Sequence, residues 1–260
     1  MKEDYKININ KIDNFGGNLV KSFSLGSVGK EVLGTGPYEY YIYESNKDEK
    51  IAIDDLGSFT VFILFKPPEA NVTSLEIKSP ILEGDCIQVE SEVLNLDISG
   101  GSIKLLIAGT KQSHPELKGV YLTRNKDIYK VEKPWGHELW LNKEHPLYVL
   151  KEIYIKNGTK TSLQYHNFKQ ETNVLFEGEA LLHYKSAKDV ENDEASAKDI
   201  SQTQILPISS IDVEPRILHR LEALSDLLLY ETSTPHLDDV VRISDDSNRG
   251  DGRVLEEHNS

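Results

Sequence analysis

Short hydrophobic runs recur along the chain and are separated at close intervals by Gly, Pro, Asn or Asp. The runs are rich in β-branched and aromatic residues, which is typical of β-strands. No amphipathic helical stripe longer than two turns accompanies them. Many short strands with turns between them predict an all-β protein made of antiparallel sandwiches or barrels. We expect strands at 51–53, 59–65, 72–77, 86–89, 103–108, 149–155, 172–176, 180–184 and 227–232.

The expected strands form two groups, one before residue 110 and one after residue 130. Between them, residues 111–130 have the mixed charge and the Gly and Pro content of a connection. A chain of 260 residues has room for two domains. We therefore expect one β-domain at 1–128 and a second at 129–260, with a C-terminal tail over the mouth of the second barrel. Residues 185–204 are charged and poor in apolar side chains, which predicts a mobile connection.

Composition excludes several classes of protein. The 43 acidic and 29 basic residues give a net charge of −14, which argues against binding to nucleic acids or to a membrane surface. The single cysteine, Cys86, leaves no internal disulfide and no cysteine-rich zinc site. The first residues are charged and contain no apolar stretch, so we expect no signal peptide and a cytoplasmic protein.

One segment carries the residue types of a metal site. Gln164 and His166 are two positions apart, so on a strand they project from the same face. Glu171 follows after four residues that can form a turn, which would place it on the adjacent strand. Imidazole, carboxylate and amide oxygen together suit a divalent cation. The natural candidate for a fourth ligand is His219, just before the expected strand 227–232.

The spacing of Gly158, Gln164, His166, Glu171 and Gly178 resembles the first cupin motif. Glutamine preceded by Ser162 and Leu163 is similar to the SLQ-x-H segment of the type II phosphomannose isomerases of the cupin superfamily. Further matches follow in the same order, over about residues 131–250. They are Pro134-Trp135-Gly136, Lys151, the segment His219-Arg220-Leu221-Glu222, Glu231, the segment Asp238-Asp239-Val240-Val241-Arg242, and Arg249.

The resemblance implies a cupin-type antiparallel barrel. The N-terminal half contains a single histidine, His114, and we expect it to form a second barrel without a metal site. It also implies a metal-dependent isomerase that interconverts an aldose phosphate and a ketose phosphate, of the mannose-6-phosphate/fructose-6-phosphate type. The metal ligands would be Gln164, His166, Glu171 and His219.

In the same family pattern, Lys151 and Arg249 are the expected catalytic residues, and Arg242 and Glu231 are expected to bind substrate. Zinc ranks first as the metal because it favours imidazole with carboxylate, although manganese, cobalt, nickel or iron would also fit. The expected partner is a small sugar phosphate, and the sequence leaves a homodimer open.

Two other functions remain open at this point. Cupins also host Fe(II) dioxygenase chemistry, although glutamine at a ligand position counts against it. A non-catalytic module that binds a sugar or a sugar nucleotide could retain the same site. The chain also departs from the family pattern, because Asn167, Phe168 and Lys169 replace the residues after the first histidine of HxHR.

The family pattern generates a prediction for Arg249. If its guanidinium holds a phosphate or a developing oxyanion, Arg249→Ala should cost about 2–4 kcal/mol of transition-state stabilisation, or roughly 30- to 1000-fold in kcat/KM. Arg249→Lys should restore little of the lost activity, because lysine lacks the planar guanidinium that can form two parallel hydrogen bonds. Kinetics and thermal unfolding of both variants test this. Activity within threefold of the parent would show a solvated surface charge, and a large fall in Tm would show a structural role.

Overall fold

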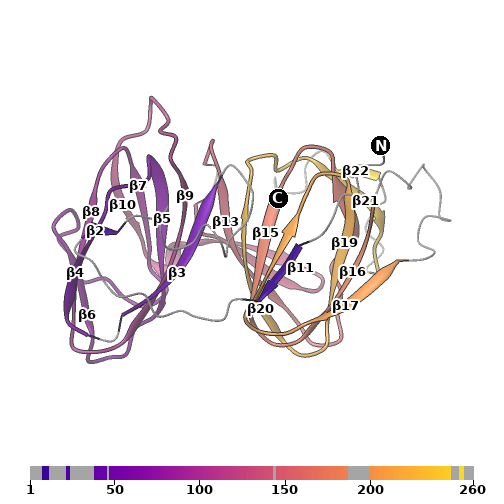
Figure 1. Ribbon diagram of the computed structural model, residues 1–260, viewed down its shortest axis with the longest axis horizontal. Helices are drawn as coiled ribbons and strands as arrows, with labels where there is room; N and C mark the ends of the chain where they lie inside the picture. The colour runs from indigo at the N-terminus through magenta and orange to yellow at the C-terminus, as the bar shows by residue number, and fades with distance from the viewer. Residues whose placement is uncertain are drawn as a thin grey trace. The chain divides into compact units, whose positions relative to one another are not determined.

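The computed structural model describes residues 8–11, 22–23, 38–45, 47–142, 145–186, 200–246 and 252–254. Within this part the chain forms β-strands and a single short 3-10 helix at Asn125–Asp127. None of the helices there is long and apolar enough to cross a membrane. The protein is therefore all-β, as the hydrophobic pattern predicted (Figure 1).

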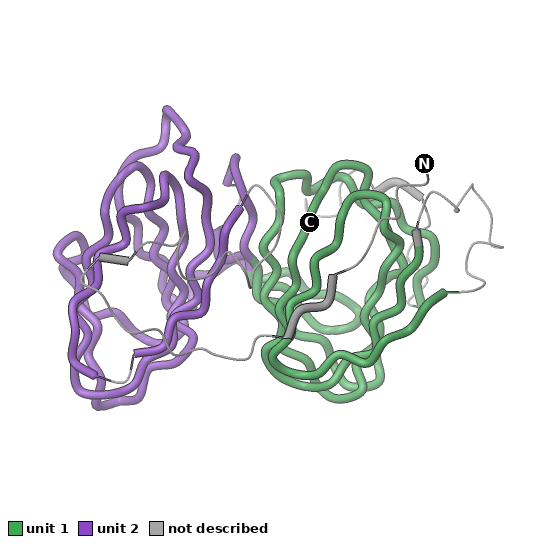
Figure 2. The backbone as a smooth tube through the Cα atoms, viewed as in Figure 1, with its two compact units in different colours: residues 1–11, 130–139, 151–260 green, residues 12–129, 140–150 purple. Residues whose placement is uncertain are grey.

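The chain divides into two compact units (Figure 2). Unit 1 contains residues 1–11, 130–139 and 151–260, and unit 2 contains residues 12–129 and 140–150. The expected boundary after residue 128 lies close to the observed change at 129/130. Two short segments depart from that simple division, since 1–11 joins the C-terminal unit and 140–150 joins the N-terminal one.

Unit 2 is built from two sheets. A five-stranded sheet has the order β10-β7-β5-β9-β3, and a four-stranded sheet has the order β2-β4-β8-β6. Alternation along the strands sends one set of side chains inward. Phe59, Val61, Ile87, Val89 and Ile107 are all 0% exposed, so this interior is packed with apolar side chains. The strands are β2 Ser22–Phe23, β3 Glu39–Ser45, β4 Glu49–Ile53, β5 Ser58–Phe65, β6 Asn71–Ser74, β7 Cys86–Glu90, β8 Leu94–Ser99, β9 Ile103–Thr110 and β10 Gly119–Thr123.

The opposite face of the five-stranded sheet carries buried polar side chains that contact His145 and Tyr148. Ser58 lies opposite Glu90 in the register of β5 and β7. The Tyr148 hydroxyl bonds to the Thr60 hydroxyl at 2.8 Å. The Nε2 of His145 lies 2.8 Å from Oε1 of Glu90, with both side chains 0% exposed. These buried polar contacts explain why residues 140–150 belong to unit 2.

Unit 1 also consists of two sheets. Its seven-stranded sheet has the order β1-β18-β15-β20-β13-β12-β11, and its six-stranded sheet the order β17-β16-β19-β14-β21-β22. Leu175, Leu182, Leu221 and Leu229 belong to the apolar cluster between them. The strands are β1 Asn8–Lys11, β11 Tyr129–Lys133, β12 Gly136–Trp140, β13 Val149–Ile155, β14 Leu163–His166, β15 Glu171–Glu177, β16 Ala180–Ser186, β17 Ser201–Ile205, β18 Ser209–Val213, β19 Ile217–Ala223, β20 Leu227–Ser233, β21 Val240–Ser244 and β22 Gly252–Val254.

Eight of the nine expected strands lie wholly inside observed ones, and β6 ends at Ser74, three residues before the expected end of the ninth. The predictions of connections at 111–130 and 185–204 were wrong in part. Residues 119–123 form β10, at the edge of the five-stranded sheet. Residues 201–204 belong to β17, which pairs with β16. Edge strands such as these bury little surface, so their hydrophobic pattern is weak. Residues 187–199 lie outside the described part.

The pair of His145 and Glu90 generates a stability prediction. The backbone N–H of Leu147 donates to Nδ1 of His145, so its Nε2 carries the hydrogen that Glu90 accepts. Burial raises the pKa of Glu90, but hydrogen bonds from His145, Ser58 and Gln88 outweigh it and lower that pKa below 4.5. His145→Ala leaves a buried carboxylate without this donor and should cost about 3 kcal/mol. Denaturant unfolding measures the loss.

The matched control is His114→Ala, in a loop of the same unit, where the side chain is half-exposed. It should change the free energy of unfolding by less than about 0.5 kcal/mol. Equal effects of the two substitutions would contradict the role given to the buried pair. Because folding lowers the pKa of Glu90, its contribution to stability is present above pH 4.5 and is lost as the pH falls through the folded pKa.

Candidate metal centre

The two sheets of unit 1 enclose a cavity with a polar part and an apolar part. Its apolar lining comes from both sheets and includes Trp135, Ile153, Ile155, Leu182 and Leu229. Its polar lining consists of Lys133, Glu138, Lys151, Thr161, Ser162, Gln164, His166, Lys169, Glu171, Asn173, His219 and Glu231. Ionisable side chains removed from water in this way must pair with one another or bind a ligand.

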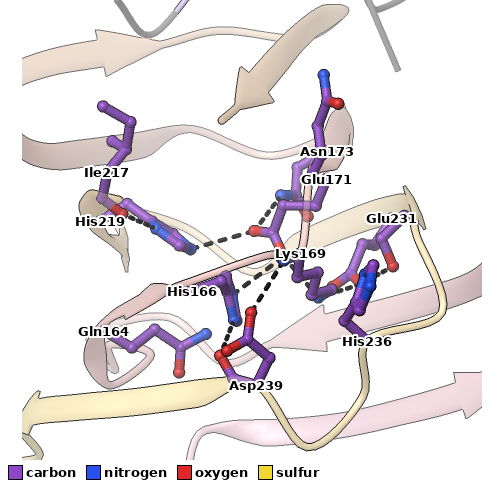
Figure 3. Close-up of polar contacts among 12 residues, drawn as sticks. Gln164, His166, Lys169, Glu171, Asn173, Ile217, His219, Glu231, His236 and Asp239 are labelled. Atoms are coloured by element: carbon purple, nitrogen blue, oxygen red, sulfur yellow. Dashed lines mark hydrogen bonds and ion pairs between the residues drawn. The ribbon is translucent and has the colours of Figure 1, made fainter. Parts of the chain in front are cut away.

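Three of the four predicted metal ligands come together in this cavity. His166 ends β14, Glu171 begins β15, and His219 lies within β19. All three are buried, and their donor atoms lie within 4.8 Å of one another (Figure 3). The Nε2 of His166 is 3.5 Å from Oε2 of Glu171, and the Nε2 of His219 is 3.1 Å from Oε1. This is a two-histidine, one-carboxylate set of the kind that binds divalent metals.

Gln164, the fourth predicted ligand, lines the same cavity. It lies directly opposite His219 in the register of β14 and β19, so the two side chains share a face. Its Oε1 accepts a hydrogen bond of 2.7 Å from the Ser162 hydroxyl. A second lone pair of that oxygen remains for a cation.

Backbone contacts orient both imidazoles so that their Nε2 atoms face Glu171. The Nδ1 of His166 lies 2.9 Å from the carbonyl oxygen of Asp239, and the Nδ1 of His219 lies 3.0 Å from that of Ile217. A carbonyl only accepts, so each Nδ1 carries a hydrogen and each neutral ring presents the Nε2 lone pair. The Nε2 of His166 is buried without a hydrogen-bond partner among the described residues. A divalent ion bound by this lone pair and by the Glu171 carboxylate would satisfy both groups.

The pKa directions agree with this geometry. Burial lowers the pKa of His166, which keeps its ring neutral. Burial also acts to lower the pKa of His219, but its contact with Glu171 outweighs this and raises it. Burial raises the pKa of Glu171, yet the Lys169 ammonium and the two imidazoles bring it well below its ordinary value. The carboxylate of Glu171 is therefore ionised, which is the form that binds a metal ion.

Lys169 is a central residue of the site that the sequence pattern did not single out. Its Nζ lies 2.6 Å from Oε2 of Glu171 and 2.7 Å from Oε1 of Glu231. Glu231 also accepts a hydrogen bond of 3.0 Å from Ser233. The two carboxylates raise the pKa of Lys169 although burial lowers it. The predicted substrate-binding residue Glu231 is thus inside the cavity, as the ion-pair partner of a lysine.

Asp239 orders the turn that carries Lys169. Its Oδ2 accepts from the backbone N–H of Phe168 at 2.5 Å and of Lys169 at 2.9 Å. Burial raises the pKa of Asp239, but these backbone hydrogen bonds outweigh it and lower the pKa. Together with the contact between its own carbonyl and His166, Asp239 ties β21 to the turn between β14 and β15. The family motif contained this residue, but only the structure shows its role.

A second charged cluster contains the predicted catalytic residue Lys151. Lys151 lines the cavity together with Ile153 and Ile155, because the three residues alternate along β13. Its Nζ lies 3.3 Å from Oε2 of Glu138, whose Oε1 is 3.7 Å from Nζ of Lys133. Neither Lys133 nor Glu138 was predicted. Strand alternation was the available signal, since Lys133 is two positions from the buried Val131.

The two predicted arginines have different outcomes. Arg242 is buried on β21, directly opposite Gln164, and its Nε lies 3.8 Å from Oδ2 of Asp245. Arg242 does not line the cavity as described, although Val240 two positions earlier does. Arg249 lies outside the described residues. Its catalytic role remains a prediction.

Comparisons with known proteins show the fold. No family model matches the sequence, and no curated protein does so either. Among solved structures, protein Ylba from E. coli aligns with a TM-score of 0.58 at 7% identity, covering 77% of this chain and 78% of that one. The Bacillus subtilis oxalate decarboxylase, described with Mn(II) centres, aligns at 0.53 with 12% identity over 80% and 72%. A salicylate 1,2-dioxygenase from Pseudoaminobacter salicylatoxidans aligns at 0.52 with 10% identity over 76% and 72%.

These alignments span both units, and the fold is the cupin-type jelly roll with two barrels that the motifs predicted. At such low identities they establish the fold alone. None of the three structures is a phosphomannose isomerase. The resemblance to that branch therefore rests on the sequence motifs.

The cluster generates a metal-binding prediction. His166→Ala or Glu171→Ala should remove most of the bound divalent ion, because each takes away a buried ligand. Elemental analysis after dialysis against zinc or manganese measures the occupancy, and circular dichroism checks that the barrel remains folded. Full occupancy in both variants would refute the assignment.

A matched control is His183→Ala. His183 lies on β16 next to the cavity residue Leu182, so it points to the other side of the sheet, where it contacts Glu222 at 2.8 Å. Metal content should stay at the level of the parent protein. A loss as large as that of His166→Ala would mean that any histidine removal perturbs the barrel.

Proposed function

We propose that the protein is a metal-dependent isomerase that interconverts an aldose phosphate and a ketose phosphate. The observation that carries the proposal is the buried Nε2 of His166, which faces Glu171 without a hydrogen-bond partner among the described residues. A divalent ion bound by His166, Glu171, His219 and Gln164 would polarise a carbonyl or hydroxyl oxygen of the substrate. The motif resemblance to type II phosphomannose isomerases supplies the reaction class.

Zinc and manganese are the two metals that we propose first. Two imidazoles with one carboxylate suit zinc, and the added amide oxygen of Gln164 gives a harder set that also suits manganese. The oxalate decarboxylase with the related fold is described with Mn(II) centres. Loading the protein with each ion in turn and comparing turnover would decide between them.

Lys151 and Glu138 are the proposed proton-transfer pair. Isomerisation moves a proton between two neighbouring carbons while negative charge develops on oxygen. The Glu138 carboxylate can accept a proton, and the Lys151 ammonium 3.3 Å away can stabilise the developing charge. Trp135, Ile153 and Leu229 border the same cavity, and their apolar side chains would limit the access of water to the reacting atoms. Glu231 and Arg242 are the proposed substrate contacts, and Arg249 is a further proposed catalytic residue.

The proposal predicts activity on a phosphorylated sugar and a defined role for Lys151. A coupled assay across hexose, pentose and heptose phosphates should identify a substrate for the metal-loaded protein. Lys151→Met should lower kcat by about 100-fold or more, because it removes a charge that acts during the reaction. Lys156→Met is the control, since Lys156 is exposed just beyond the same strand. Metal-replete protein that binds these sugars but never converts them would contradict the proposal.

An Fe(II) dioxygenase is the second candidate, because two histidines and one carboxylate are the usual ligands of non-haem Fe(II) oxygenases. The fold of a salicylate 1,2-dioxygenase is also similar. Gln164 beside this triad and the charged residues of the cavity favour the isomerase. Iron in the purified protein, with oxygen uptake on addition of an aromatic acid, would favour the dioxygenase instead.

A further inference from the structure

Lys169 places a positive charge directly beside the candidate metal ligands. Its Nζ lies 2.6 Å from Oε2 of Glu171, and the same oxygen lies 3.5 Å from Nε2 of His166. The ammonium and a metal ion would therefore contact one and the same carboxylate (Figure 3). Lys169 and Glu171 are both buried, so little water would screen the repulsion between the ammonium and a divalent ion.

The structure holds Lys169 in this position at both ends. Its backbone N–H donates to Oδ2 of Asp239, which orders the turn before β15. Its Nζ lies between two carboxylates, because it is also 2.7 Å from Oε1 of Glu231. That oxygen in turn accepts a hydrogen bond of 3.0 Å from the Ser233 hydroxyl. The lysine is thus anchored inside the cavity that would receive the metal ion.

Glu231 pairs with the ammonium without joining the candidate metal ligands. Among the described residues, the group whose donor atoms all lie within 4.8 Å of one another consists of His166, Glu171 and His219. Glu231 is reached from this group through the Lys169 ammonium. It therefore offers the ammonium a second anion that a metal ion on Glu171 would not occupy.

We infer that Lys169 is a built-in competitor of the metal ion and sets the affinity of the site. In the metal-free protein its ammonium neutralises Glu171, and in the metal-bound protein Glu231 retains it beside the ion. The inference rests on the metal site of the proposed function. It assigns a role to a residue that is not itself a ligand.

Two properties of the protein follow from this competition. A buried carboxylate without a counter-charge destabilises a fold, so a barrel that contained the ligands alone would depend on its metal. With Lys169 in place, the metal-free barrel keeps Glu171 paired and remains folded. The same ammonium repels the incoming ion, so the metal is bound less tightly than its ligands alone would allow.

Metal titration of Lys169→Met tests the inference. The variant should bind Zn²⁺ or Mn²⁺ at least about tenfold more tightly than the parent, because it lacks the competing charge. Its metal-free form should have a lower Tm, and addition of the ion should raise that Tm by more than in the parent. Competition with a chelator measures the affinity, and circular dichroism follows the unfolding.

Two further variants serve as controls for the loss of a lysine. Lys130→Met removes a lysine of the same unit whose side chain is 45% exposed and lies 2.8 Å from Glu132, so the metal affinity should not change. Lys169→Arg keeps the positive charge and should bind the ion within about threefold of the parent. Together they show whether the effect belongs to the charge at position 169.

The double variant Lys169→Met/Glu231→Gln separates competition from net charge. It removes one positive and one negative charge, so the total charge of the cavity stays that of the parent. The ammonium contacts Glu171 directly and Glu231 does not, so the double variant should still bind the metal more tightly than the parent. Glu231→Gln alone should weaken metal binding, because the ammonium then depends on Glu171. The double variant also decides the matter if Lys169→Met does not fold.

The affinities of the folded variants can overturn the inference. Equal metal affinity in the parent, Lys169→Met and the double variant would show that the ammonium does not compete. Weaker binding in the double variant would show that Lys169 holds Glu171 in place for the ion. A parent protein that binds no divalent ion would instead contradict the metal site and, with it, the proposed function.

Discussion

The site of unit 1 depends on one buried anion, the carboxylate of Glu171. Its side chain is 5% exposed, and an ionised carboxylate removed from water to this degree costs several kcal/mol unless its charge is balanced. The balancing groups come from separate strands: Lys169 and Asn173 lie beside it on or next to β15, His166 on β14 and His219 on β19. Because β14 and β19 belong to one sheet and β15 to the other, the charge is satisfied only when the two sheets close in the correct register.

The two units place their polar side chains on different faces of their sheets. Strand residues alternate between the two faces of a sheet, so a polar residue lies inside or outside according to its parity alone. In unit 2 the polar residues Ser58, Thr60 and Glu90 occupy the face away from the apolar core, where Tyr148 and His145 cover them. In unit 1, Lys151 of β13, His166 of β14 and Glu171 of β15 line the cavity. The barrel of unit 1 therefore encloses ionisable groups beside its apolar cluster, whereas residues such as Phe59, Val61 and Ile87 make the interior of unit 2 apolar.

The sequence was sufficient to predict the strands and residue spacings that depend on a local pattern. The strand 149–155 was predicted with its observed bounds, and the spacing of His166 and Glu171 placed both in one site. The sequence was insufficient to predict contacts between residues that are far apart in the chain. Lys169 meets Glu231 across 62 residues, and His145 meets Glu90 across 55. In a chain with 28% charged residues, each of these resembles a solvated surface position until the register of remote strands is known.

Lys169 and the metal ligands can share Glu171 because the carboxylate has two oxygens with separate partners. Oε1 faces Asn173 and His219, whereas Oε2 faces Lys169 and His166. A cation that draws charge from Glu171 would weaken its attraction for the Lys169 ammonium. The Lys169 ammonium would then need a second anion. Glu231 provides it, since its Oε1 lies 2.7 Å from the same ammonium. The second glutamate therefore allows one carboxylate to serve both as a metal ligand and as the anchor of a buried lysine.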